Sequence, residues 1–383
     1  MARHYLDHAS TSPLRLEARD AMVAWLDASS RGEVADPSRI HVEGMTSRAL
    51  LEQARGQVAA LFGARSREVV FTSGATEAIA AATWGAVERG PHVVLAAVEH
   101  SAVRESSEVF AQTVGGSVTI VGVDGLGRVD ADELGAAIRP DTGLVHVQWG
   151  NHEVGTVQPV AEVVERARAA GVLVHVDAAA AGGRVPIDFG GLSADLVSIS
   201  GHKFGGPPGT GALLVRRGLR LRPLLRGGDQ ERARRAGLEN LPALIGWGAA
   251  CEALAVDGAL AAEQQRSRRL TDALVAGATG LDGVHQLGDP DDRLPHLVCL
   301  GIDGIEPQAV LLGLDQSGIA AHSGSACASE ALEPSPVLEA MGVDAHRSLR
   351  LSVGWSTTDD DVGAVLAALP PVLARLRALG SPA

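Results

Sequence analysis

Lys203 is a candidate reactive residue, because it is the only lysine in a chain of 383 residues. It follows a short apolar segment and the run Ser200-Gly201-His202, and it precedes a glycine-rich stretch, 205–211. A lysine amine can form a Schiff base, which an arginine cannot, and glycines let a backbone approach a ligand closely. An ordinary surface lysine is the alternative, but the neighbouring residues favour a reactive amine.

A phosphate-binding turn is predicted where the segment 68–72 ends and a helix follows. The turn reads Thr72-Ser73-Gly74-Ala75-Thr76. The first backbone N–H groups of a helix have no partner within the helix and attract anions. Thr76 could add a hydroxyl, and Ser200 and His202 could donate to the same anion. The alternative is a serine or threonine that only caps the helix.

Two further residues at expected strand ends could contact a flat ring. His175 and Asp177 end the segment 172–177 and share one face, because side chains alternate along a strand. A carboxylate there could keep a ring nitrogen protonated, although an aspartate that merely opens a helix is the commoner case for such a residue alone. His100 follows the segment 92–98 and could stack on a ring or move protons, although a lone histidine is more often structural.

The three cysteines lie in different surroundings. Cys327 lies in the Gly/Ser-rich run 323–329, which predicts an exposed thiol that could act as a nucleophile or could be inert. Cys251 and Cys299 lie in apolar segments, which predicts buried and unreactive thiols. Arg350 is surrounded by apolar strand residues, so its guanidinium is expected to pair with a ligand carboxylate or with an internal acid.

Strand-like and helix-like segments that alternate along the chain must position these residues. Strands are expected at 68–72, 92–97, 117–121, 144–148, 172–176 and 196–199, with a helix at 159–170. This alternation predicts a mainly parallel sheet covered by helices. The chain turns helical after Gly237, and a smaller α+β unit is expected from about residue 285. Its last helix should start at 356–361, with Thr358 or Ser356 as the cap.

Composition excludes several classes of protein. The formal net charge of −13 argues against a nucleic-acid-binding face. Three cysteines form neither a disulfide framework nor a zinc-site spacing, and no metal is expected. The N-terminus lacks the apolar core of a secretory signal, and no run approaches 18 uninterrupted apolar residues. These features predict a soluble protein of a reducing cytoplasm.

Taken together, the motifs resemble those of the cysteine desulfurases, which belong to the class-V aminotransferase group of fold-type I enzymes that use pyridoxal 5'-phosphate. The matching segments occur in the family's order over nearly the whole chain: YLDHASTSP, FTSGATEA, EHSAV, NHEVGTVQPV, HVDAAAAGG, SGHKFGGPPGTGALLVRRG, SGSACASEALEPS and LRLSVGWSTT. The combination is far more specific than any single motif. The SGSAC run resembles the branch of the family that has a mobile catalytic loop.

The resemblance implies an α/β fold with two domains. Residues 15–256 would form a large domain with a mainly parallel seven-stranded sheet between helices. Residues 1–14 and 257–383 would form a smaller α+β domain that carries the cysteine loop. A homodimer is also implied.

The resemblance also implies how the cofactor is held. Lys203 would be its covalent anchor, and Ala75, Thr76, Ser200 and His202 would bind its phosphate.

The ring and the substrate would be held by further residues. His100 would stack on the ring and assist catalysis, and Asp177 would pair with the ring nitrogen. Arg350 and Asn151 would bind the substrate, and Cys327 would attack the sulfur of L-cysteine. The products would be L-alanine and a persulfide on Cys327, from which an acceptor protein takes the sulfur.

Three positions depart from the family pattern. Ala180 replaces a glutamine that contacts the phenolic oxygen of the cofactor, and His152 replaces an asparagine near the ring. Leu238 replaces a threonine that reaches the phosphate of the other subunit. Because two contacts around one atom change together, His152 is expected to compensate for Ala180 by binding the phenolic oxygen.

Other functions remain to be distinguished from this one. An aminotransferase, a selenocysteine lyase or a cysteine-sulfinate desulfinase could share the fold, and so could a non-catalytic scaffold. The sequence does not identify the sulfur acceptor, which could serve iron–sulfur assembly, tRNA thiolation, cofactor synthesis or DNA phosphorothioation.

Overall fold

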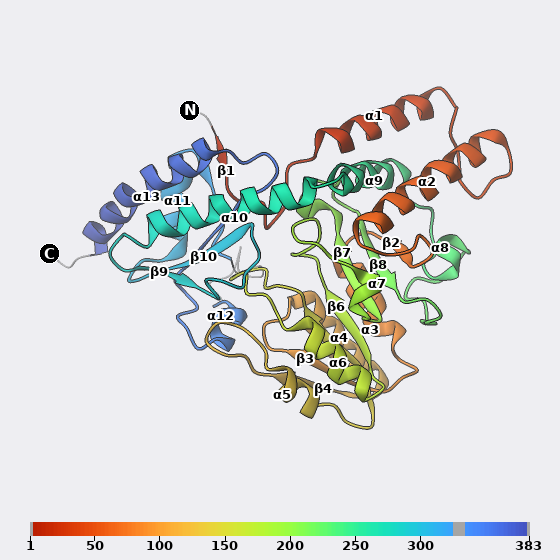
Figure 1. Ribbon diagram of the computed structural model, residues 1–383, viewed down its shortest axis with the longest axis horizontal. Helices are drawn as coiled ribbons and strands as arrows, with labels where there is room; N and C mark the ends of the chain where they lie inside the picture. Colours follow the sequence, from red (N-terminus) through yellow and green to blue (C-terminus); the bar gives the residue numbers. More distant parts are fainter. Residues whose placement is uncertain (1–2, 325–333, 381–383) are drawn as a thin grey trace.

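A seven-stranded sheet forms the centre of the computed structural model, which describes residues 3–324 and 334–380 (Figure 1). Its strands are β2 (Val69–Thr72), β3 (His92–Ala96), β4 (Ser117–Val121), β5 (Thr142–Gln148), β6 (Leu173–Asp177), β7 (Leu196–Ser200) and β8 (Gly211–Val215). Their order is β2-β8-β7-β6-β5-β3-β4, and only β8 runs antiparallel to its neighbours. The mainly parallel sheet expected from the sequence is confirmed.

Helices cover both faces of this sheet, which is why its strands are apolar along most of their length. One face packs against α2 (Val42–Leu61), α6 (Val160–Ala169) and α9 (Leu241–Ala255), whose Val58, Val163 and Trp247 belong to the largest core. The other face packs against α3 (Ala75–Gly85) and α4 (Ser101–Val114) through Ile79 and Val103. Shorter or more peripheral helices complete this part: α1 (Leu16–Ser30), α5 (Ala131–Ala136), α7 (Phe189–Leu192) and α8 (Gln230–Ala233).

A second, smaller core lies around the antiparallel sheet β12-β10-β9. Its strands are β9 (Val284–Leu287), β10 (Leu297–Ile302) and β12 (Ser348–Ser352), and its helices are α10 (Ala259–Ala278), α11 (Pro307–Gln316) and α13 (Asp359–Gly380). The short helix α12 (Pro336–Ala340) packs instead on the largest core through Val337 and Leu338. The N-terminal strand β1 (His4–Tyr5) pairs with β11 (Ile319–Ala320), so both chain ends lie in this part. The domain bounds given above remain a prediction.

The last helix, α13, is long and apolar enough to cross a membrane by length and composition alone, as is the bent pair α9 and α10 if it is counted as one span. Neither contains 18 uninterrupted apolar residues, and the expectation that the protein does not contact a membrane stays a prediction. The helix also has a buried face, since Val365, Leu369 and Leu373 are part of the smaller core. That packing gives α13 a structural role beside the small sheet.

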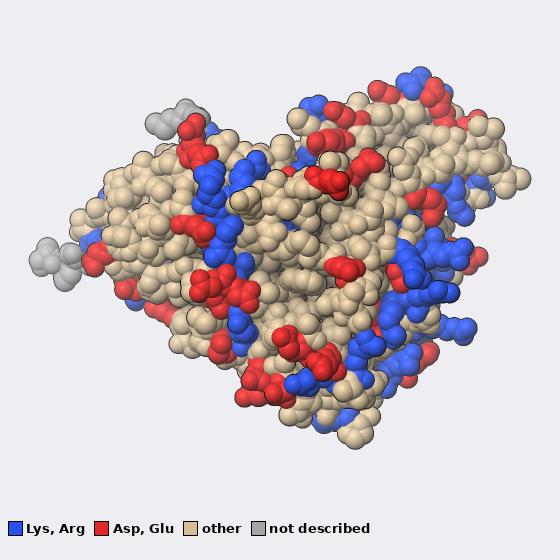
Figure 2. Space-filling view, in the orientation of Figure 1, with Lys and Arg blue, Asp and Glu red and all other residues tan. Residues whose placement is uncertain are grey.

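The acidic net charge is unevenly distributed over the surface. Figure 2 shows basic side chains gathered along the edge that carries α8. The exposed arginines of the segment before α8 are Arg216, Arg217, Arg220, Arg222 and Arg226. The net charge of −13 therefore conceals a locally basic surface.

Candidate active site

A cavity of about 400 Å³ opens at the carboxyl ends of the central parallel strands. Eight of the predicted site residues line it: Ala75, Thr76, His100, His152, Asp177, Ser200, His202 and Lys203. A larger hollow of about 710 Å³ lies between α2 and the segment 229–239, and none of the predicted residues lines it. The sheet edge is the usual ligand site of open α/β folds, so the smaller cavity is the candidate.

The start of α3 forms one end of the cavity. The helix begins at Ala75, and the backbone turns at Gly74 to reach it. Gly211 of β8 lies directly beneath this turn, because a Cβ there would come within 2.6 Å of Gly74. The glycine therefore lets the turn lie on the sheet, and the first N–H groups of α3 border the cavity.

Lys203 lines the cavity from the 3-10 helix η1 (Gly201–Phe204), which follows β7. Its Nζ donates to the carbonyl of Ala9 at 2.5 Å. Burial lowers the pKa of Lys203 to about 8, and the nearby charge of Arg350 acts in the same direction. The lowered pKa increases the neutral, nucleophilic fraction of the amine near neutral pH.

The N-terminal segment contributes a cavity residue that the sequence did not indicate. Thr11 lines the cavity, and its Oγ1 lies 3.1 Å from Nδ1 of His202. Glu77 and Gln148 also line it. Glu77 and Thr11 lie within quoted motifs, but nothing in their spacing assigned them to the cavity.

Asp177 is buried at the end of β6. Its Oδ1 accepts hydrogen bonds from the backbone of Ala179 at 2.9 Å and from the hydroxyl of Ser198 at 3.1 Å. Burial raises the pKa of Asp177, and these two hydrogen bonds oppose the rise. Both contacts use Oδ1, so Oδ2 is available to a basic nitrogen in the cavity.

Two histidine rings meet above the sheet edge. His100 caps α4, and its Nδ1 accepts from the backbone of Ala102 at 3.0 Å. The ring of His152 packs edge-on against it, with 4.9 Å between the ring centroids. Burial lowers the pKa of His100 to about 3, so this ring is neutral at physiological pH. His152 and Ala180 line the same cavity. The contact by which His152 would compensate for Ala180 is made to the phenolic oxygen of the cofactor, and it stays a prediction.

Arg350 lies behind the cavity rather than in its lining. Its guanidinium donates to Asp7 at 3.1 Å, to Ser10 at 2.7 Å and to the carbonyl of His152 at 2.8 Å. Its Nε is buried and has no hydrogen-bond partner among the described residues. Of the two partners that the sequence allowed for Arg350, an internal acid is therefore present, namely Asp7. The Nε–H group of Arg350 remains without an acceptor among the described residues.

Asn151 is not among the residues that line the cavity. It is fully buried, and its Nδ2 donates to the carbonyl of Val98 at 3.2 Å. Its Oδ1 accepts from the backbone of Glu153 and Val154, both at 2.8 Å. The amide thus supports the turn that carries His152, and the substrate-binding role of Asn151 stays a prediction.

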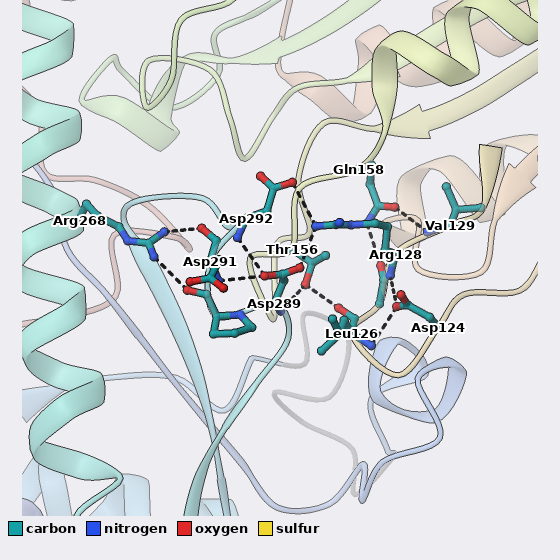
Figure 3. A network of polar contacts seen from close by, with 12 residues as sticks. Asp124, Leu126, Arg128, Val129, Thr156, Gln158, Arg268, Asp289, Asp291 and Asp292 are labelled. Carbon is teal, nitrogen blue, oxygen red and sulfur yellow. Dashed lines mark hydrogen bonds and ion pairs between the residues drawn. The ribbon is translucent and has the colours of Figure 1, made fainter.

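The loop that carries His152 is held by a network from both parts of the molecule (Figure 3). Thr156 donates to the carbonyl of Leu126 at 2.6 Å and accepts from the backbone of Asp289 at 3.0 Å. Arg128 pairs with Asp289 at 2.8 Å and with Asp292 at 3.1 Å. These contacts fix the loop between the end of β5 and the start of the small sheet.

The two described cysteines are buried, as the sequence predicts. Burial raises the pKa of Cys299 to about 12 and that of Cys251 well above its ordinary value, so neither is a thiolate near neutral pH. Cys327 lies outside the described residues. Beyond it in the chain, Ser335 caps α12 and donates to the buried Glu153 at 2.5 Å.

The described lining fits a phosphorylated aromatic aldehyde. It offers a buried amine, a helix N-terminus, a neutral ring and a carboxylate with one free oxygen. These groups match the aldehyde, the phosphate, the ring face and the ring nitrogen of pyridoxal phosphate, respectively. Within residues 3–324 and 334–380, no group of three or more His, Cys, Asp or Glu could hold a metal ion.

Comparisons with known proteins agree with this geometry. The family model described as aminotransferase class-V matches residues 4–365. A protein named cysteine desulfurase IscS from Methanosarcina thermophila is 40% identical over 97% of this chain and 92% of its own. A protein named cysteine desulfurase from Cereibacter sphaeroides is 41% identical over 99% of this chain and 98% of its own. A solved structure titled NifS-like protein superposes with a TM-score of 0.89 at 31% identity, over 98% of this chain and 100% of its own.

Proposed function

The chain belongs to the aminotransferase class-V family and, within it, to the cysteine desulfurases. On this basis we propose which residue performs each part of the reaction. It is a pyridoxal-phosphate-dependent enzyme that converts L-cysteine to L-alanine and passes the sulfur on. The observation that carries the assignment of roles is the buried amine of Lys203, which lies in one cavity with a helix N-terminus and Asp177.

The cofactor would be held at four points. Lys203 would bind it covalently, and the N–H groups at Ala75 and Thr76 would hold its phosphate together with Ser200 and His202. Asp177 would keep the ring nitrogen protonated through Oδ2, and His100 would cover one face of the ring. When bound, pyridoxal phosphate supplies an electron sink for the charge left after a proton departs from the α-carbon of the substrate.

Lys203 would also move that proton. In the cavity without a ligand, its Nζ is a free amine with a pKa of about 8. Such an amine can accept a proton near neutral pH and later return it. Arg350, whose Nε lacks a partner, would orient the substrate by its carboxylate.

Cys327 is proposed as the sulfur acceptor within the enzyme. Its thiolate would attack the substrate Sγ, so that an S–S bond forms as the substrate C–S bond breaks. The electron pair of the broken bond stays with the three-carbon fragment, which becomes alanine after protonation. The support for this role is the family resemblance of the SGSAC motif.

The remaining assignments are proposed from the family alone. The enzyme would be a cytoplasmic homodimer that contacts neither membrane nor nucleic acid directly. It would transfer its persulfide sulfur to an acceptor protein in iron–sulfur assembly, tRNA thiolation or DNA phosphorothioation.

Two variants test the assigned roles. Lys203→Ala should abolish alanine formation and the imine absorbance of the bound cofactor. Cys327→Ser should retain the absorbance but accumulate no protein-bound persulfide when L-cysteine is supplied. Alanine formed at the normal rate by Lys203→Ala would refute the first role, and persistent persulfide in Cys327→Ser would refute the second. A keto acid in place of alanine and sulfide would indicate an aminotransferase.

A further inference from the structure

Glu77 is an unexpected neighbour for a phosphate. It lies in the first turn of α3 and lines the cavity, with only 13% of its side chain exposed. Its Oε2 accepts from the backbone of Ser73 at 2.8 Å, within the turn proposed to hold the phosphate. A carboxylate there stabilises the helix, but it repels a dianion at the same helix end.

Arg235 neutralises this carboxylate from a distant part of the chain. Its Nε lies 2.9 Å from Oε1 of Glu77 and its Nη2 lies 3.3 Å from Oε2. Both side chains are largely shielded, with 23% and 13% exposed, which strengthens the pair relative to a surface ion pair. The two contacts form the bidentate arrangement that fixes a guanidinium on a carboxylate.

The segment that carries Arg235 is itself firmly held. Glu231 is buried, accepts from Arg55 at 2.6 and 2.8 Å, and accepts from the backbone of Phe71 at 2.8 Å. Glu231 and Arg232 adopt left-handed backbone angles, with φ of 48° and 59°. Non-glycine residues hold this conformation only where surrounding contacts enforce it, so the approach of Arg235 to Glu77 is enforced by the fold.

The described lining of the cavity contains no arginine to offset Glu77. Burial lowers the pKa of His202 to about 4 and that of His100 to about 3, so both rings are neutral at physiological pH. Lys203 is the remaining strong base in the lining, and its amine is consumed when it holds the cofactor covalently. Arg235, just outside the lining, is therefore the permanent cation paired with Glu77 at the phosphate end.

We propose that Arg235 is a positioning residue for phosphate recognition, which cancels the charge of Glu77 so that the start of α3 can accept a dianion. The inference rests on the proposed function, since it assumes that this turn holds the cofactor phosphate. It assigns the phosphate affinity to a pair of residues separated by 158 positions in the sequence. Glu77 retains its role as the acceptor for Ser73.

Cofactor binding to the full-length chain, stripped of cofactor, tests the pair. Arg235→Gln leaves Glu77 charged and should weaken pyridoxal phosphate binding about tenfold, as one unbalanced charge near a phosphate implies. Glu77→Gln keeps an oxygen for Ser73 and should bind at least as tightly as the wild type. The double variant should return to within about twofold of the wild type, and Arg235→Lys should stay close to it.

Pyridoxal, which lacks the phosphate, separates an electrostatic effect from misfolding. Its affinity should be the same in all these variants, as should their thermal midpoints within a few degrees. Arg222→Gln is the matched control, because Arg222 precedes α8, whereas Arg235 follows it, and stacks on the ring of Trp84 at 5.4 Å from its centroid; this variant should leave both affinities unchanged.

Three results would overturn the proposal: unchanged pyridoxal phosphate affinity in Arg235→Gln, an equal loss for pyridoxal, or a double variant as weak as Arg235→Gln. The last result would mean that Arg235 acts on the phosphate without Glu77. Failure of the wild-type chain to bind pyridoxal phosphate would instead refute the proposed function.

Discussion

The chemistry of single residues here depends on what their surroundings do to their charge. Lys203, His100 and Asp177 lie in one cavity, and burial shifts the pKa of each toward its neutral form. The cavity therefore presents a nucleophilic amine and an uncharged ring near neutral pH. A protonated ring nitrogen paired with Asp177 would lower the pKa of this carboxyl again.

The lowered pKa of Lys203 predicts a distinct pH dependence for cofactor attachment. Only the neutral amine attacks an aldehyde, and about half of it is neutral at pH 8 when the pKa is about 8. The rate at which pyridoxal phosphate attaches to the stripped enzyme should rise up to about pH 8 and then level off. Stopped-flow absorbance measures this rate.

Free lysine acetylated on its α-amino group, which keeps its side-chain amine, is the control for this prediction. Its attachment rate should keep rising beyond pH 10, because its amine titrates near 10.4. An enzyme rate that follows the same rise to pH 10 would contradict the lowered pKa.

The cavity residues come together because the strands and helices that carry them end or begin at the same edge of the central sheet. β6 and β7 deliver Asp177 and Lys203 to one edge because they run parallel, and α3 and α4 start at that edge with the phosphate turn and His100. The loop after β5 adds His152 only because other segments hold it. The precision of the site therefore depends on how helix starts and loops are fixed.

The two hydrogen bonds of the Thr156 hydroxyl are expected to stabilise the loop that carries His152. Thr156→Val preserves the shape of the side chain but leaves the carbonyl of Leu126 and the N–H of Asp289 without this partner. Unfolding free energy should fall by about 2 kcal/mol, since buried unpaired polar groups carry such penalties. Urea denaturation measures it, and Thr113→Val, on an exposed helix face, should leave it nearly unchanged.

The first turn of α13 is capped by side-chain hydrogen bonds. Thr358 and Asp361 form a capping box: Asp361 accepts from the backbone of Thr358 at 2.8 Å, and the backbone of Asp361 donates to the Thr358 hydroxyl at 3.4 Å. Of the two caps that the sequence allowed, Thr358 is confirmed. Thr358→Ala should lower the unfolding free energy by about 1 kcal/mol, whereas Ser356→Ala should have no effect in the same denaturation experiment.

At the scale of the whole molecule, the fold buries several histidines in their neutral form. His146 and His175 meet inside the central sheet, with 2.9 Å between their Nδ1 atoms. Burial lowers the pKa values of His8, His100 and His146 to about 3 and that of His175 well below its ordinary value. Folding therefore excludes protons that the unfolded chain would bind.

This burial predicts that the protein is sensitive to acid. Below pH 6.5 the unfolded chain protonates these histidines while the folded chain does not, so stability is greatest above pH 6.5 and falls as the pH decreases toward their folded pKa values. Each histidine contributes a slope of about 1.4 kcal/mol per pH unit in that window. Thermal midpoints of the cofactor-free chain should thus drop steeply between pH 6.5 and pH 4.

His285 is the matched control, because 55% of its side chain is exposed. His285→Gln should leave the acid profile unchanged. A constant thermal midpoint from pH 7 to pH 4.5 would contradict the prediction.

The sequence by itself determined the elements and the motifs. The expected strand 117–121 coincides with β4, and the expected helix 159–170 becomes α6, Val160–Ala169. Lys203, Asp177 and the phosphate turn were placed at strand ends by apolar runs that stop at polar residues or glycines. These signals are local, because a strand or a helix start is specified by residues that are neighbours in the chain.

Only the tertiary structure decided which distant residues complete the site. It joins Arg235 to Glu77, Arg350 to Asp7, and Thr11 to His202, and it turns the Asn151 amide inward to support a loop. No periodicity encodes such pairs, because their partners are separated by tens to hundreds of residues and meet only when both cores have packed. The lone lysine could be recognised in the sequence, but the charges that tune its cavity could be assigned only from the folded chain.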